Sequence, residues 1–94
     1  MAKSKLEKAV EERAGSLNDA QRELVMSQLA VYKRNRARMR QVDGALDRLA
    51  ARPAATREEV RAKQAERSTL TYEYNQLATA NSRISAELFK QLGD

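Results

Sequence analysis

The chain has 94 residues, a formal net charge of +5, and neither cysteine nor histidine. Without these two residue types, disulfides, thiolate zinc sites and most general bases are excluded, so we expect no enzyme, no cofactor and no metal site. The length allows one domain, expected over residues 1–94. Few glycines, one proline and 33% charged residues are typical of long solvated helices, and 41% hydrophobic residues argue against disorder.

The N-terminal segment, residues 1–15, is expected to form a short helical arm. Leu6, Ala9 and Val10 recur on one side of it, and Gly15 is placed to end the helix. A helix this short is marginal in water, so the arm is expected either to dock on another surface or to fray. No apolar run near the start indicates a signal peptide or a membrane span, which predicts no membrane contact and a cytoplasmic location.

The first long helix is predicted over residues 16–52. Two pairs of residues near its start have the spacing of a capping box, namely Ser16 with Asp19 and Asn18 with Gln21. Beyond the start, apolar residues recur with a heptad period, as in a coiled coil. The seam positions are Val25, Tyr32, Met39 and Leu46 in one row, and Gln28, Asn35, Val42 and Leu49 in the other.

A break is predicted at Pro53, because proline cannot donate its amide and disfavours helix in the residue before it. Thr56 then has the position of a cap, with Glu59 reaching back to it in a capping box. The second long helix is expected over residues 56–92, with Gly93 just past its end.

A connection of only a few residues requires the two long helices to lie side by side and antiparallel. The sequence therefore predicts an all-α fold, a long, coiled-coil-like antiparallel two-helix hairpin with a short N-terminal helical arm. Folding about the proline pairs residues whose numbers add up to about 109. The expected pairs are Val25 with Ile84, Tyr32 with Leu77, Met39 with Leu70, Leu46 with Lys63, Gln28 with Asn81 and Asn35 with Tyr74.

Polar residues face one another twice in this pairing, at Gln28 with Asn81 and at Asn35 with Tyr74. A matched buried amide pair fixes the register of two helices, which is one interpretation of Gln28 and Asn81. The alternative is that both lie at the edge of the seam and contact water.

More apolar side chains are present than one narrow seam can bury. We expect the surplus to face a further chain in a homo-oligomer, either a dimeric bundle or a ring. Residual exposure on a monomer is the alternative, since scattered apolar surface residues are ordinary. The residues expected at the oligomer or partner interface are Leu24, Leu29, Val31, Leu88 and Phe89.

The excess positive charge of the chain lies between Lys33 and Arg52. Its densest part has five cations in eight residues and could neutralise several phosphates of nucleic acid without reading its sequence. The alternative is a solvated helix face whose cations pair with acidic residues of a neighbour. The cations are Lys33, Arg34, Arg36, Arg38 and Arg40.

Glutamates of the second long helix are expected to form ordinary surface ion pairs, and they are Glu58, Glu59, Glu66, Glu73 and Glu87.

The segment from Leu17 to Lys33, followed by the basic helix, resembles the opening of phage terminase small subunits. The last helix is similar to the C-terminal helix in one branch of that family, through Leu77, Asn81, Ile84, Leu88, Phe89 and the final Leu92-Gly93 pair. The resemblance covers most of residues 17–93.

Membership of that family would imply a ring-forming hairpin that binds double-stranded viral DNA, in the host cytoplasm, and recruits the large motor and nuclease subunit. The resemblance implies a DNA-facing role for the five cations named above. This chain departs from the family pattern in two ways, because it has no helix-turn-helix domain ahead of the hairpin and its inter-helix loop is very short. Contact with DNA is therefore expected to be independent of base sequence.

A second hypothesis is a helical adaptor or export chaperone, which would cover a partner's amphipathic helix with its exposed apolar stripe. Two packed helices offer no cleft for a small-molecule substrate, so none is expected.

Overall fold

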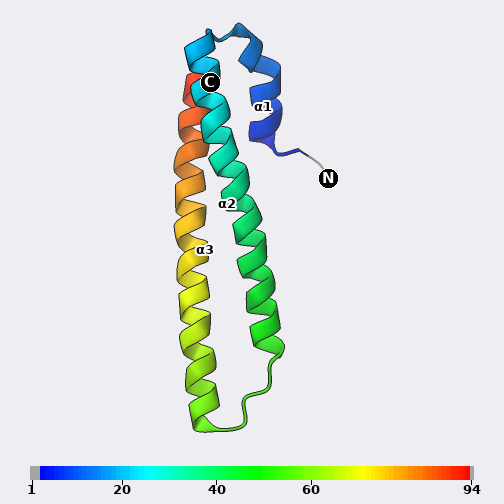
Figure 1. Ribbon diagram of the computed structural model, residues 1–94, viewed down its shortest axis with the longest axis vertical. Helices are drawn as coiled ribbons and strands as arrows, with labels where there is room; N and C mark the ends of the chain where they lie inside the picture. Colours follow the sequence, from blue (N-terminus) through cyan, green and yellow to red (C-terminus); the bar gives the residue numbers. More distant parts are fainter. Residues whose placement is uncertain (1–2, 94) are drawn as a thin grey trace.

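Three α-helices make up the chain in the computed structural model, which describes residues 3–93. They are α1 (Lys5–Arg13), α2 (Asp19–Ala51) and α3 (Arg57–Gln91), and a 3₁₀ turn at Ala14–Ser16 follows α1. α2 and α3 run antiparallel as a rod about 60 Å long (Figure 1). The predicted all-α hairpin with an N-terminal helical arm is confirmed. The first two residues of the predicted arm and the last residue of the predicted domain lie outside the described residues.

The start of α2 is set by Asn18, one of the two expected caps. The Asn18 side chain accepts a hydrogen bond from the Gln21 amide at 2.8 Å, and the Gln21 side chain accepts one from the Asn18 amide at 3.2 Å. This reciprocal pair satisfies two amides that the first turn of a helix leaves free. Ser16 instead donates its hydroxyl to the Arg13 carbonyl at 2.8 Å. The long helix therefore begins at Asp19 and not at residue 16.

The bend between the long helices lies where Pro53 predicts it. α2 ends at Ala51, and Thr56 caps α3 by accepting a hydrogen bond from the Glu59 amide at 3.1 Å. The returning bond differs from the prediction by one residue, because the Glu59 carboxylate accepts from the amide of Ala55, at 3.1 Å.

The end of α2 lies beside Lys63, well inside α3. The Lys63 ammonium donates to the carbonyl oxygens of Ala50, at 3.2 Å, and Arg52, at 2.8 Å. A cation at this position stabilises α2, because the last carbonyls of a helix lack amide partners and carry partial negative charge. Figure 1 shows the connecting loop running past the end of α2 to reach the start of α3. The first turn and a half of α3, residues 57–62, is exposed as a result.

This offset makes the predicted pairing of the helices wrong. Asn81, expected opposite Gln28, accepts a hydrogen bond from the Asn35 side chain at 3.0 Å and donates one to the Tyr32 carbonyl at 3.2 Å. The register is off by roughly one to two helical turns, because the loop does not fold symmetrically about Pro53. A buried amide pair does join the helices, but Asn81 forms it with Asn35. The Gln28 side-chain oxygen is buried without a hydrogen-bond partner among the described residues.

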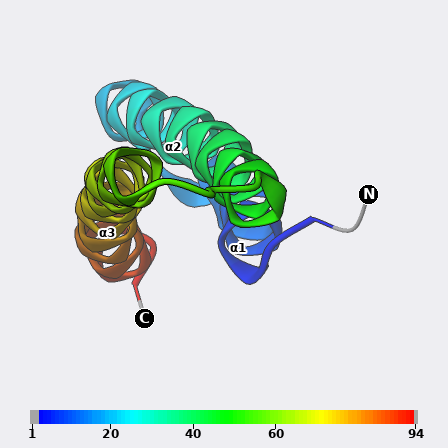
Figure 2. The same ribbon diagram turned by 90° about the horizontal axis from the view of Figure 1, so that it is seen from below.

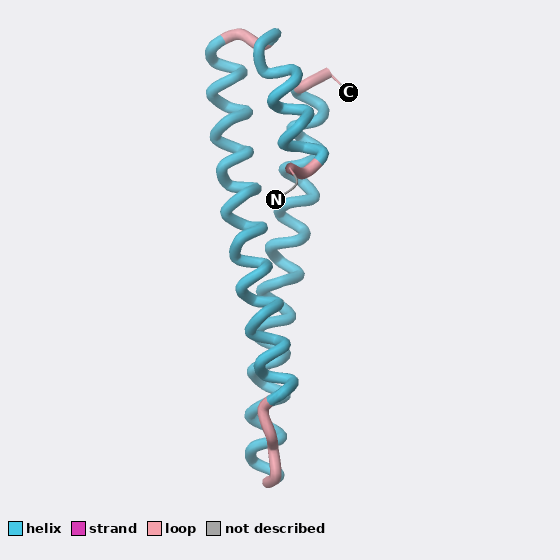
Figure 3. The backbone as a smooth tube through the Cα atoms, turned by 90° about the vertical axis from the view of Figure 1, so that its right-hand side faces the viewer, coloured by secondary structure: helices cyan, strands magenta, loops and turns pink. Residues whose placement is uncertain are grey.

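The main core lies at the open end of the hairpin, where α1 folds back onto both long helices. End-on and side views place α1 against the hairpin at the end remote from the loop (Figures 2 and 3). The arm therefore docks, which is one of the two expected outcomes. The core consists of Leu6, Ala9 and Val10 of α1, Val25 and Leu29 of α2, Leu88 at the end of α3 and Leu92 just after it.

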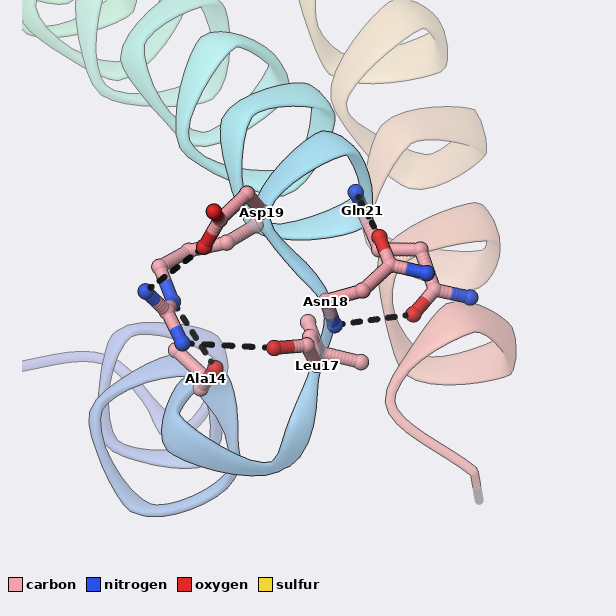
Figure 4. A network of polar contacts seen from close by, with 6 residues as sticks. Ala14, Leu17, Asn18, Asp19 and Gln21 are labelled. Carbon is pink, nitrogen blue, oxygen red and sulfur yellow. Dashed lines mark hydrogen bonds and ion pairs between the residues drawn. The ribbon is translucent and has the colours of Figure 1, made fainter.

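Arg22 holds the connection between α1 and α2 in place. Its guanidinium donates to the carbonyl oxygens of Ala14 and Leu17, both at 3.2 Å, and lies 3.6 Å from the Asp19 carboxylate (Figure 4). These contacts fix the direction in which the chain turns, and so position α1 on the hairpin. No helix within residues 3–93 is both long and apolar enough to cross a membrane.

Candidate nucleic-acid interface

The five cations predicted to face nucleic acid lie in the middle of α2 and are divided between two sides of it. At roughly 100° per residue, Lys33, Arg36 and Arg40 follow one side, the side on which α1 docks. Arg34 and Arg38 lie more than a quarter turn away, toward the opposite face of the hairpin. The side chains of the five therefore do not form one continuous surface.

Arg38 is engaged by α3. Its guanidinium binds the Glu73 carboxylate through two hydrogen bonds, one of them 2.9 Å long between Nη2 and Oε1. The hydrogen bond from Arg38 lowers the pKa of Glu73 below its ordinary value, and the same bond raises the pKa of Arg38. The sequence predicts an ordinary surface ion pair for Glu73, and in the structure this pair joins the two long helices. Because this fork-shaped pair compensates its charge, Arg38 is the least available of the five for an external phosphate.

Arg36 is partly engaged by the arm. Its guanidinium lies 5.9 Å from the centre of the Tyr32 ring, within the range of a cation–π contact, and 3.8 Å from the Glu7 carboxylate of α1. These contacts hold the side chain at the edge of the surface that α1 covers. Arg36 therefore links the basic segment to the docked arm.

Lys33, Arg34 and Arg40 are exposed, and none of them forms a hydrogen bond or an ion pair with another residue in the 3–93 range. Their charges are therefore uncompensated within the part of the chain that the structure describes. No ion pair within the chain has to break before these side chains neutralise a phosphate, so these three are the strongest candidates for contact with nucleic acid.

Two of the five residues predicted at an oligomer or partner interface are inside the core, and the prediction is wrong for them. Leu29 is 5% exposed and Leu88 is 0% exposed, because α1 covers both. Phe89 is partly buried and packs against the same core. The surplus apolar surface expected from the hairpin alone is thus largely taken up by the chain's own arm.

Leu24 and Val31 remain as candidates for contact with another chain. Leu24 is 50% exposed and Val31 is partly buried. The two are seven residues apart, so they lie on one side of α2, about 140° around the helix from Leu29. This places them on the face of the hairpin away from α1.

A groove between α2 and α3, not predicted from the sequence, adjoins the docked arm. It is shallow and open to solvent, has a volume of about 540 Å³, and is lined by Tyr32, Arg36, Met39, Ala78, Asn81, Ser82, Ser85 and Ala86. A neighbouring hollow of about 310 Å³ shares Arg36 and Met39 with it and adds Arg40, Asp43 and Tyr74. The set of residues that lines the groove depends on the register of α2 and α3. The register predicted from the sequence is incorrect and does not bring these residues together.

Within residues 3–93, no three Asp or Glu side chains come together so as to hold a metal ion. Neither protein-family models nor curated proteins nor solved structures give a match to the chain. Functional assignment therefore rests on the chain's own residues.

Proposed function

We propose that the chain is a non-catalytic DNA-packaging component resembling a phage terminase small subunit. In this role it contacts double-stranded DNA through α2, associates with further copies of itself, and recruits a large motor and nuclease subunit. The observation that carries the DNA contact is the set of three uncompensated cations, Lys33, Arg34 and Arg40, on one exposed segment of α2. Arg36 adds a fourth charge at the edge of that segment.

The spacing of these cations is compatible with contact to the phosphates of one DNA strand. Lys33 and Arg40 are seven residues apart on the same side of α2, which separates their backbone positions by roughly 10 Å along the helix. Both side chains are long and flexible and can reach neighbouring phosphates of one backbone. Phosphate contacts of this kind supply affinity that is independent of sequence and weakens as salt rises.

Removing the three uncompensated charges tests the DNA contact. The variant Lys33→Gln/Arg34→Gln/Arg40→Gln is expected to bind a short fluorescent DNA duplex at least about tenfold more weakly at low salt, because three phosphate contacts are lost. Fluorescence anisotropy measures the affinity, and circular dichroism checks that the helices persist.

A matched control changes the same total charge elsewhere. Arg57, Arg61 and Arg83 are exposed residues of α3, and replacing all three by glutamine is expected to weaken binding by less than about threefold. Equal losses in the two triple variants would show that net charge alone governs binding. That result, or no binding by the unaltered protein, would contradict a DNA contact on α2.

Self-association is proposed through the face that carries Leu24 and Val31. Of the three uncompensated cations, Lys33 and Arg40 lie on the α1 side and only Arg34 lies toward this face, where the cross-helix pair of Arg38 with Glu73 is internally neutral. Light scattering is expected to give a mass above that of one chain, and Leu24→Glu is expected to reduce it by burying a charge in the contact. A single-chain mass for the unaltered protein at high concentration would contradict assembly.

A further inference from the structure

The groove beside α1 continues the surface on which α1 is already seated. The arm places Leu6 and Val10 in the core between the long helices, while Glu7 lies 3.8 Å from Arg36 at the edge. Arg36 also lines the groove, so the seat of α1 and the groove meet at this residue. The chain thus contains its own example of how a helix binds this face of the hairpin.

The lining of the groove matches one face of an amphipathic helix. Tyr32 and Met39 of α2 and Ala78 of α3 supply apolar surface, whereas Ser82 and Ala86 are small and allow a helix to approach α3 closely. Together, the groove and the adjoining hollow extend along α2 from residue 32 to residue 43, a length of roughly 16 Å, or three helical turns.

Positive charge along one edge of the groove favours a partner that carries negative charge. Arg36 and Arg40 are one helical turn apart on α2, and Lys33 lies on the same side. Among residues 3–93, Asp43 is the single acidic residue that lines the groove or the hollow. A second copy packed with the same face against this one would bring these like charges together, which disfavours self-association here. Glutamates of an incoming helix would instead extend the pairing that Glu7 makes with Arg36.

We infer that this groove binds an acidic amphipathic helix of another protein. Small apolar residues of that helix face Met39 and Ala78, and its glutamates or aspartates run along the edge formed by Arg36 and Arg40. The inference rests on the recruiting role in the proposed function and names the kind of segment through which a partner is recruited. It also places partner and DNA on overlapping residues, since Arg40 belongs to both surfaces.

Two synthetic peptides and two tryptophan variants test the groove. The first peptide is a fluorescent amphipathic helix with alanine and leucine on one face and glutamates along one edge, and the second has lysine in place of every glutamate. Anisotropy is expected to show that the acidic peptide binds at least about tenfold more tightly than the basic one. Ser82→Trp, which fills the groove without changing charge, is expected to weaken the acidic peptide at least about tenfold.

Ser68→Trp is the matched control, because Ser68 is an exposed residue of α3 outside the groove and should leave peptide binding unchanged. Equal binding of the two peptides, no binding of the acidic peptide, or no effect of Ser82→Trp would overturn the inference. DNA binding by Ser82→Trp is expected to be unaltered. Acidic-peptide binding without DNA binding would therefore refute the DNA contact alone, and the reverse result would refute the groove alone.

Discussion

Replacing Leu88 by alanine is expected to lower the free energy of unfolding by about 3–5 kcal/mol, which is the upper part of the range for large-to-small changes in a packed core. Leu88 is 0% exposed and lies where all three helices meet, in contact with the cluster that Leu6 and Val10 bring from α1. Alanine removes its apolar contacts and leaves a cavity that helices fixed on three sides close only in part. Chains of this size are stable by about 5–15 kcal/mol, so much of the stability is expected to be lost.

Urea unfolding followed by circular dichroism measures this loss. Met26→Ala is the matched control, because a side chain of similar size is 49% exposed there, away from the face that carries Leu24 and Val31, and its truncation is expected to cost less than about 1.5 kcal/mol. A loss below about 1.5 kcal/mol for Leu88→Ala would contradict the docking of α1 over the hairpin.

Replacing Asn81 by alanine is expected to lower the free energy of unfolding by about 2 kcal/mol, because a buried partner is left without its hydrogen bond. Asn81 is 7% exposed, accepts from Asn35 and donates to the Tyr32 carbonyl. Its two bonds fix the position of α3 along α2, since a shift by one turn would bury the amide without these partners.

The control for this effect is Asn75→Ala, on the exposed side of α3, which is expected to change stability by less than about 0.5 kcal/mol. A double-mutant cycle with Asn35→Ala isolates the cross-helix bond, and a coupling of about 1 kcal/mol is expected. No coupling between Asn35 and Asn81 would contradict the observed register.

Local signals in the sequence were sufficient for the helices and the bend. Pro53 and Gly93 act through their own backbones, and Thr56 acts through a side-chain hydrogen bond to an amide three residues on, so their effects do not depend on distant residues. The register could not be obtained in the same way, because it depends on how the loop lies in space. The contact of Lys63 with the end of α2 has no counterpart in a heptad pattern, and neither does the overhang of α3 beyond it.

The sequence is sufficient to predict which residue types the candidate surfaces contain, but not how those residues are arranged in space. The five cations of α2 are evident in the sequence, whereas the pairing of Arg38 with Glu73 and of Arg36 with Glu7 joins residues far apart along the chain. Leu29 and Leu88 were assigned to an oligomer interface, since nothing in the pattern shows that a short arm will turn back to cover them. The direction of that turn is fixed by Arg22, through contacts with backbone carbonyls.

The salt dependence of DNA binding tests the proposed phosphate contacts most directly. Three contacts, from Lys33, Arg34 and Arg40, predict that the logarithm of the binding constant falls with the logarithm of the salt concentration with a slope of about −2.7. Each single change to glutamine is expected to reduce the magnitude of that slope by about 0.9. A slope that stays the same in all three single variants would show that these side chains do not contact phosphates.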